Sequence, residues 1–545
     1  MKLSRILNLF LISIIFWGLL LLPVHAGQEG QEDNSAAGAT RHGGVYRIPL
    51  MNNPTTLDPA YVQDQYGVAV VQQVFNGLVQ FGPYLMVLPA LAETWQVKEN
   101  GKVYQFVLRK DALFHNGRPV TTEDVVFSIS RLLRVNPPPD ILPHLLKING
   151  AQDYKNHKSD RIEGLEPVDD HVLRVRLKEP HTPFLTALGM YQAKIVPKSE
   201  VNRLGDKFGK NPVGSGPFRF AAWEPDKLIR LKRFSDYYAG PAFLDEIHYR
   251  IYPGVGYEQV VADFRKRKLE EMPVYGNVKQ ELSTEKKLQW FHRPSLSLLF
   301  YGIRANHPLL KHPELRKALS IAIDLQKLVA QIYKDQFEVA RTILPPGMPG
   351  YHPPNRMEAD DVSRALQELR RVLGEKGDSI PPIEIVSGSQ SAFAKAELNF
   401  VSESWAQLGI PVKIKFITDW TEFEAYVRSD SVQIYRYAWF ADMPDPDSFL
   451  HPLFASDSPN NFMRYQSKEV DQMLLTARGI VDPVERAEMY RRIEALILKS
   501  SPLIPLFYLS INRVYQSFVQ GIQLNPLAAQ FMPFHRVWLK APSSN

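Results

Sequence analysis

The chain of 545 residues contains no cysteine at all. This absence excludes disulfide bonds, zinc and iron–sulfur sites built from cysteine, and a cysteine nucleophile. A lipid-anchored exported protein needs a cysteine to acylate, so we expect no lipoprotein anchor either.

A large excess of charge of one sign is also lacking. Lys and Arg total 64 and Asp and Glu total 58, which leaves a formal charge of +6 on the whole chain. The densest basic run, Arg265 to Lys268, is only four residues long. Nucleic acid is therefore not an expected partner.

Motifs of common enzymes are missing from the chain. It contains no His-Glu-x-x-His, no phosphate-binding loop ending in Lys-Ser/Thr and no Gly-x-Ser-x-Gly. The carboxylate-rich segment Asp442 to Asp447 holds two prolines and no glycine, which argues against a calcium loop. We expect no catalytic residue, no metal and no cofactor. A secreted hydrolase stays as an alternative, because paired glycosidase carboxylates are assembled in space and leave no motif.

Long apolar runs are absent except at the start of the chain. Lys2 and Arg5 precede the apolar run Leu9 to Leu22, and Val24-His25-Ala26 follows with small residues at the cleavage positions. This layout predicts a cleavable signal peptide over residues 1–26 and a disordered polar leader over 27–42. The apolar run is short of the ~20 residues that a membrane span needs, which disfavours the alternative of an uncleaved anchor. We expect export to the periplasm.

What the chain does contain is a mixture of the hydrophobic patterns of helices and of strands. Strand-like alternation and helix-like periodicity are interspersed along the sequence, which is typical of an α/β fold. Thr121 to Asp124 resembles a capping box that opens a helix, and Gly409 is placed to end one. The predicted strands are 103–108, 171–177, 247–251 and 412–416, and the predicted helices are 125–133, 314–333, 398–408 and 483–499.

Several segments, taken together and in order, resemble one protein family. They lie along residues 43 to about 540 and are Thr56–Ala60, Val74–Leu78, Pro89–Trp95, Tyr104–Lys110, Phe114–Gly117, Thr121–Val125, Asn211–Phe218, Asp236–Tyr238, Asn306–Asp324 and Trp439–Pro446. Each segment alone is a weak signal. As an ordered set they resemble the peptide/nickel class of bacterial ABC-importer solute-binding proteins, family 5, typified by oligopeptide- and dipeptide-binding proteins.

The resemblance implies an α/β fold of two lobes that close on a ligand, the periplasmic-binding-protein clamp of type II, cluster C. An extra domain is inserted in the first lobe. By analogy, lobe I takes residues 43–78, 210–300 and 505–545. The inserted domain takes residues 79–209, and lobe II takes residues 301–504.

The resemblance also implies which residues hold the ligand. In peptide-binding members, the Asp of a Trp-x-x-Asp motif pairs with the ligand's α-ammonium, which maps onto Trp439 and Asp442. The alternative is that Asp442 caps the turn at Pro444. Arg436 stands where oligopeptide binders have an Arg near the ligand backbone or carboxylate, or else it forms an internal ion pair with a local Asp. Trp439 forms an apolar wall or packs in the core.

A second candidate segment is a glycine-rich loop. Asn211, Gly214, Ser215 and Gly216 border the cleft in the family, or form an ordinary turn. Met443 departs from the family pattern, because peptide binders often have a Tyr there.

The function implied by the resemblance is that of a substrate-binding component. It captures a peptide-like ligand and delivers it to an inner-membrane ABC permease with ATPase subunits, and it is expected to be a monomer. Other members of the family bind nickel chelates, haem, sugars or opine-like conjugates on the same fold, so these solutes stay as alternatives.

Overall fold

A computed structural model describes residues 43–540, except for residues 255, 283, 286, 354–380 and 529–530. The predicted signal peptide and leader, residues 1–42, lie outside the described part. Residues His42–Leu539 form one compact unit. Within the described residues, no helix combines the length and the apolar character that crossing a membrane requires.

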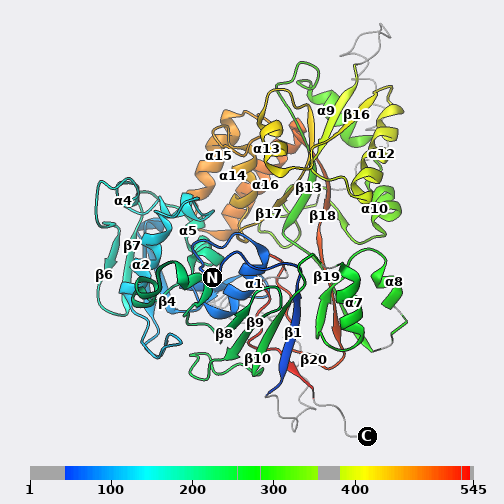
Figure 1. Ribbon diagram of the computed structural model, residues 1–545. Coiled ribbons are helices and arrows are strands. Elements are labelled where there is room, and N and C mark those ends of the chain that lie inside the picture. Colours follow the sequence, from blue (N-terminus) through cyan, green and yellow to red (C-terminus); the bar gives the residue numbers. More distant parts are fainter. Residues whose placement is uncertain are drawn as a thin grey trace, which may run out of the picture. The chain divides into compact units, whose positions relative to one another are not determined.

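The first sheet contains the strand nearest the start of the chain. Its strand order is β1-β10-β9-β8, and β1 pairs in parallel with β10, although about 200 residues separate them (Figure 1). Helix α1 packs on this sheet, and its N-cap Asp64 accepts a hydrogen bond from the Gly67 amide at 2.8 Å. The elements are β1 (Val45–Leu50), α1 (Gln65–Val74), β8 (Phe218–Glu224), β9 (Leu228–Arg233) and β10 (Glu246–Ile251).

A second, antiparallel sheet lies within residues 92–176, with strand order β4-β5-β7-β6. Helix α2 begins with the predicted capping box, in which the Asp124 carboxylate accepts from the Thr121 amide at 3.1 Å. The elements here are β2 (Val79–Phe81), β3 (Val87–Pro89), β4 (Ala92–Lys98), β5 (Val103–Leu108), α2 (Thr122–Leu132), α3 (Leu142–Leu145), α4 (Ala151–Lys155), β6 (Leu165–Pro167), β7 (Val172–Arg176), α5 (Pro183–Ala187), the 3-10 turn η3 (Tyr191–Ala193) and α6 (Lys198–Leu204).

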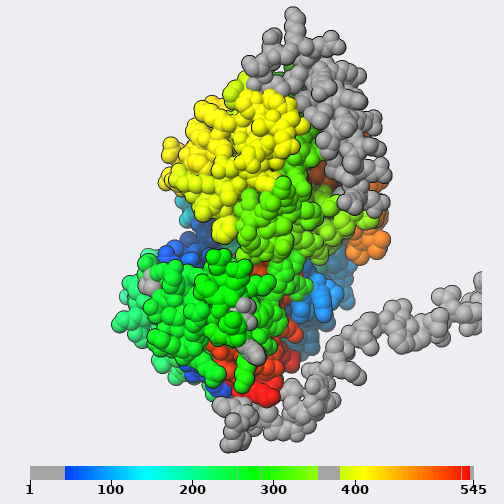
Figure 2. All heavy atoms as spheres, turned by 90° about the vertical axis from the view of Figure 1, so that its right-hand side faces the viewer, coloured from blue at the N-terminus to red at the C-terminus, as the bar shows by residue number. Residues whose placement is uncertain are grey.

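The largest sheet has six strands in the order β14-β18-β13-β17-β15-β16, with helices on both faces. Figure 2 shows part of this region in yellow above the green segment that contains α7 and α8. The elements are β13 (Ser297–Ile303), α9 (Pro313–Ile321), α10 (Leu325–Tyr333), β14 (Glu338–Val339), β15 (Ile383–Ser387), α12 (Ala392–Ala406), β16 (Val412–Phe416), α13 (Trp420–Arg428), β17 (Ile434–Phe440), α14 (Asp447–Phe454), α15 (Lys468–Gly479), α16 (Pro483–Ser500) and β18 (Leu503–Tyr508).

A three-stranded sheet, β11-β19-β12, connects to the six-stranded sheet through two chain crossings. One crossing runs from β12 to β13 and the other from β18 to β19. Hydrogen bonds tie the crossings together, since the Ser295 amide donates to Leu509 O at 2.8 Å and the Leu509 amide donates to Ser297 Oγ at 3.1 Å. The predicted lobe boundaries at residues 300 and 504 fall inside β13 and β18, and the division into lobes stays a prediction. The further elements are α7 (Tyr257–Arg265), β11 (Glu271–Pro273), α8 (Val278–Leu282), β12 (Leu288–Pro294), β19 (Ser510–Gln516), β20 (Val519–Gln520) and β21 (Trp538–Leu539).

Most elements predicted from periodicity are present. The strands predicted at 103–108 and 412–416 have the expected bounds as β5 and β16, and Gly409 adopts the left-handed φ of +75° that follows a helix end. The prediction of one helix over 314–333 is wrong, because α9 ends at Ile321 and α10 starts at Leu325. The break occurs because Asp324 acts as an N-cap and accepts from the Lys327 amide at 3.0 Å.

Candidate functional site

A cavity of about 530 Å³ lies between two parts of the chain that are far apart in sequence. One side comes from residues 138–190 and the other from residues 439–478. This volume is in the range of small-ligand sites. The lining residues are Pro138, Pro139, Asp140, Leu142, Pro143, His144, Lys147, His181, Met190, Trp439, Asp442, Met443, Asp447, Ser448, His451, Pro452, Asp457, Ser458, Pro459, Asn460 and Arg478.

Two of the three aspartates between β17 and α14 are held by arginines. Arg486 binds Asp445 through two N–O contacts of 2.8 Å. Arg478 binds Asp447 through contacts of 2.7 and 2.8 Å. Both aspartates are buried, and each bidentate pair compensates the charge that burial takes out of water. The carboxylate-rich segment is therefore anchored by ion pairs.

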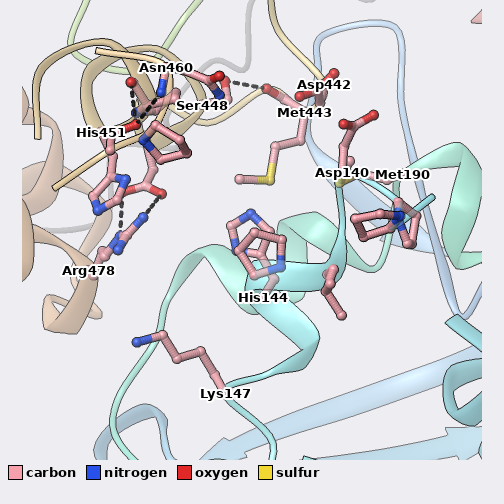
Figure 3. A pocket seen from close by; sticks show the side chains of 18 of the residues that line it. Asp140, His144, Lys147, Met190, Asp442, Met443, Ser448, His451, Asn460 and Arg478 are labelled. Carbon is pink, nitrogen blue, oxygen red and sulfur yellow. Dashed lines mark hydrogen bonds and ion pairs between the residues drawn. The ribbon is translucent and has the colours of Figure 1, made fainter. Parts of the chain in front are cut away.

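Asp442 is the third aspartate, and its surroundings are different. Among the described residues its carboxylate has no hydrogen-bond donor and no ion-pair partner. Its near neighbour is a second carboxylate, that of Asp140, which lies beside it (Figure 3). Burial, with the added repulsion of Asp140, raises the pKa of Asp442 to about 7.

Asp140 reaches this place from the loop after the three prolines at 137–139. Its Oδ2 accepts from Gln192 Nε2 at 3.2 Å, and burial raises its pKa as well. Two carboxylates side by side without a cation favour the arrival of a positive group, because that group relieves both repulsion and desolvation. This end of the cavity is therefore suited to an ammonium.

The histidines of the cavity do not supply positive charge at neutral pH. His144 Nδ1 and His181 Nε2 lie 2.9 Å apart, so one ring donates to the other. Burial lowers the pKa of His144 to about 4 and that of His181 to about 2, and it also lowers the pKa of His451. Within the described part of the chain, no cluster of three or more groups is arranged to hold a metal ion.

The two permanent cations that line the cavity already have partners. Lys147 Nζ lies 2.6 Å from Glu179 Oε1, and Arg478 is bound to Asp447. With the histidines neutral, the described lining residues leave three uncompensated carboxylates, those of Asp442 and Asp140 and that of the exposed Asp457. The cavity is therefore negative overall.

The apolar part of the cavity includes Trp439 and Met443. The Trp439 Nε1–H donates to Ser448 O at 2.8 Å, which fixes the plane of the indole. Met443 is buried and packs into the core of the β4–β7 sheet, although it comes from the other side of the cavity. The turn that follows is organised by Asp445, whose Oδ1 accepts from the Asp447 amide at 2.9 Å. The structure thus gives this turn-capping contact to Asp445, not to Asp442.

Arg436 is not among the residues that line the cavity. Its Nε and Nη2 donate to Glu397 of α12 at 2.8 and 3.0 Å, and Tyr301 also donates to Glu397 at 2.7 Å. Side chains alternate along β17, so Arg436 and Trp439, three residues apart, point to opposite faces of the sheet. Arg436 therefore forms an internal ion pair, as in the alternative interpretation, but its partner is Glu397 and not a local Asp. Its role in ligand binding stays a prediction without support from this geometry.

The loop with Gly214, Ser215 and Gly216 is buried against the end of α1 and does not line the cavity. A Cβ at Gly214 would lie 2.0 Å from Val74 O, so a close approach of two backbones requires glycine there. Asn211 is exposed, and its side chain contacts Lys207 O at 3.5 Å. Ligand roles for these four residues stay predictions, and the observed contacts are those of a structural turn.

Sequence reasoning missed the half of the cavity that precedes residue 200. Asp140, His144, His181 and Met190 lie in a region whose prolines predict only the end of a helix. The spacing of these residues gives no pattern, because they come from different short elements. Asp140 had one usable signal, a carboxylate directly after a rigid proline run.

Comparisons with known proteins agree on one family. A family model described as bacterial extracellular solute-binding proteins, family 5 middle, matches residues 87–461. The dipeptide-binding protein of Escherichia coli (strain K12) is 26% identical over 474 residues, which cover 83% of this chain and 87% of that protein. Heme-binding protein A of Haemophilus influenzae is 26% identical over 462 residues, which cover 80% and 81%.

The solved structures give the fold. The periplasmic murein tripeptide-binding protein MppA, in its unliganded open form, matches with a TM-score of 0.80 at 19% identity. The match covers 93% of this chain and 99% of that one. This likeness confirms the predicted fold class, an α/β clamp of two lobes, and the extra domain in the first lobe stays a prediction.

Proposed function

Because the chain belongs to the bacterial extracellular solute-binding proteins of family 5, we propose that it captures a short peptide with a free α-amino group. The ligand would lie in the cavity between residues 138–190 and 439–478. Its ammonium would meet the Asp442 carboxylate.

One observation carries this proposal. Of the three aspartates in the segment 442–447, Asp445 and Asp447 are each bound by an arginine, and Asp442 faces the cavity without a cation. A carboxylate in such surroundings is costly unless a positive group pairs with it. A peptide ammonium supplies both the charge and three hydrogen-bond donors.

The charge of the cavity separates the peptide from other solutes that relatives bind. Haem, named in one relative, carries two carboxylates, and a negative cavity would repel them at the Asp442 end. An oligosaccharide has no positive group to compensate the two aspartates. We therefore favour binding of a cationic group over these alternatives. We also interpret the Asp442–Asp140 pair as a receptor for an ammonium, not as the acid and base of a hydrolase.

Membership of the family supports a proposal for the partner and the compartment. We propose that the protein acts in the periplasm after removal of residues 1–26 and delivers its ligand to an ABC permease with ATPase subunits. We propose that it does so as a monomer without a cofactor.

The test of the proposed function is a ligand screen on mature protein that has been unfolded and refolded to remove bound solute. Di-, tri- and pentapeptides with free amino groups are compared with the same peptides after N-acetylation, and with haem, a nickel chelate and an oligosaccharide. A true ligand at one hundred times its Kd stabilises the fold by about 2.7 kcal/mol in a thermal shift. Stabilisation by free-amine peptides alone is the expected result. Equal stabilisation by acetylated peptides, or stabilisation by another solute alone, contradicts the proposal.

The affinity is expected to fall as the medium becomes acidic. Asp442 binds an ammonium only when ionised, and its pKa in the unliganded protein is raised to about 7. Lowering the pH from 7.5 to 5.5 should therefore raise the Kd of a free-amine dipeptide about 25-fold, since protons compete for the carboxylate. Calorimetric titrations across this range measure the effect.

The Asp140→Asn variant is the control for this pH dependence. Removing the neighbouring charge lowers the pKa of Asp442, so the same acidification should change the Kd less than in the wild type. A Kd that stays constant from pH 7.5 to 5.5 in the wild type would show that Asp442 does not bind the ligand.

A further inference from the structure

A second, smaller cavity of about 70 Å³ lies beside α1 and the C-terminal segment. Its volume is about twice the share of one water molecule in the liquid, so it has room for a group of carboxylate size. The polar residues that line it are five amides and one lysine. They are Gln72, Gln73, Asn76, Gln80, Asn525 and Lys194.

Lys194 is the unusual member of this set. Only 6% of its surface is exposed, and among the described residues its Nζ has no hydrogen-bond acceptor and no carboxylate partner. Burial lowers its pKa to about 8, with no neighbouring charge contributing. The side chain therefore remains mostly charged near pH 7, and a buried ammonium without a counter-ion is costly.

Two of the amides around Lys194 are already oriented by other contacts. Gln73 is fixed at both ends, since its Nε2 donates to Met532 O at 2.9 Å and its Oε1 accepts from the Phe534 amide at 3.2 Å. Asn525 Oδ1 accepts from the Leu527 amide at 2.9 Å. Because the oxygen of Asn525 is engaged in this way, its NH2 group is available to donate to a guest. Lys194 and Asn525 together offer donors to an acceptor and no negative charge.

One short stretch of chain contributes residues to both the small cavity and the larger one. Gly189 lines the small cavity, and the next residue, Met190, lines the large one. Between Met190 and Lys194 stands the single 3-10 turn η3, so their Cα atoms are roughly 8–13 Å apart.

Tyr191, on η3, packs against a residue of the small cavity and is influenced by charges of the large one. Its ring packs against Phe531 of the small cavity with centroids 6.4 Å apart, and the charges of Asp140 and Asp442 contribute to raising its pKa. The carboxylate end of the large cavity and a residue that lines the small one thus both act on the same tyrosine.

We propose that the cavity at Lys194 is an anion subsite that receives a carboxylate. The inference rests on the proposed function when the carboxylate is the C-terminus of the bound peptide. The other source of the same chemistry is a free small anion. The large cavity itself offers a ligand carboxylate no unpaired cation among its described residues, so Lys194 complements Asp442 with the opposite charge.

The first experiment uses a free anion as the probe and needs no peptide. Acetate is titrated into the mature protein while the salt of a bulky sulfonate holds the ionic strength constant. The Tm is measured at each acetate concentration. Wild type should gain about 1–3 °C, and Lys194→Met and Lys194→Gln should gain nothing. Lys207→Met, which removes an exposed lysine that does not line the cavity, should respond as the wild type does.

The second experiment compares a tripeptide with its C-terminal amide by calorimetry. If the peptide supplies the carboxylate, the amide should bind wild type at least tenfold more weakly, and this ratio should approach one in the Lys194 variants. An acetate effect with equal binding of peptide and amide identifies a free anion as the occupant.

The proposal is overturned if neither the acetate shift nor the amide ratio depends on Lys194. Failure of all peptides to bind wild type contradicts the proposed function instead, and the acetate titration then decides the subsite alone. Two variants at Lys194 guard against a folding defect in one of them, since Met keeps the apolar stem and Gln keeps a polar end.

Discussion

Replacement of Asp442 by Asn is expected to lower the affinity for a free-amine dipeptide by about 30- to 1,000-fold and, at the same time, to stabilise the unliganded protein. The loss of affinity follows because the ligand ammonium keeps its desolvation cost and loses its counter-charge, a change typically worth about 2–4 kcal/mol. Calorimetry measures the affinity. Thermal unfolding without ligand measures the stability.

The gain in stability follows from the raised pKa of Asp442. In the folded chain this pKa is about 7, against 3.8 for an unperturbed Asp, so the folded state binds more protons than the unfolded state between these values. The wild type therefore loses stability as the pH rises from about 4 to about 7. An asparagine side chain at this position cannot ionise and avoids the loss. The variant's advantage should be absent below pH 4 and reach about 1–3 kcal/mol above pH 7.

Asp457→Asn is the matched control for this prediction. Asp457 lines the same cavity but is exposed, so its replacement should change the affinity less than about twofold and leave the stability unchanged. A variant at position 442 that unfolds more easily than wild type at pH 8, or that still binds the dipeptide with wild-type affinity, would refute the role given to Asp442.

Removal of the Arg486 guanidinium is expected to destabilise the fold strongly. Arg486→Met leaves Asp445, only 2% exposed, without the two 2.8 Å contacts that compensate its charge. Breaking one side of a buried pair typically costs about 3–5 kcal/mol. Urea unfolding at pH 7.5 should show this loss as a lower midpoint. Ligand affinity should fall too, because Asp445 orients the turn that carries Asp442.

Two further variants locate the cause of that loss. Asp445→Asn combined with Arg486→Met removes the stranded charge and keeps the side-chain acceptor for the Asp447 amide, so most of the stability should return. Arg491→Met changes an exposed arginine of the same helix that pairs with Glu488 on the surface, and it should cost less than about 1 kcal/mol. If the double variant is no more stable than Arg486→Met alone, lost packing explains the effect and the buried charge does not.

The fold was largely accessible from sequence because its strands and helices carry clear periodicity. The alternation at residues 103–108 reflects burial of one face of β5, so pattern and structure agree. The helix predicted over 314–333 failed because an apolar stripe continues through the break. The helix is interrupted because the Asp324 side chain accepts a hydrogen bond from the Lys327 backbone amide. Hydrophobic periodicity does not reveal such local contacts between a side chain and the backbone.

The candidate site was accessible only in part. Asp442 and Trp439 were indicated by a local motif whose spacing on a strand and turn brings both to the cavity. Arg436 could have been separated from them by the same reasoning, since an offset of three residues in a strand reverses the face.

Asp140 and Lys194 could not be found from sequence by such reasoning. Their significance depends on which charges surround them in space, and Asp442 lies about 300 residues after Asp140 in the chain. A single sequence shows that the chain contains acidic residues, but it does not show which of them are in contact in the fold. The unpaired state of a lysine is likewise a property of the whole fold.

The position of β19 determines when the β11-β19-β12 sheet can form during synthesis. This strand lies between β11 and β12, and its Arg513 pairs with Glu271, 242 positions earlier. A ribosome or translocase that has released everything up to residue 500 has therefore not yet supplied the middle strand of that sheet. Closing so long a loop is entropically unfavourable and slow compared with local folding. The order of strands thus keeps the β11-β19-β12 sheet incomplete until residues 510–516 have been supplied.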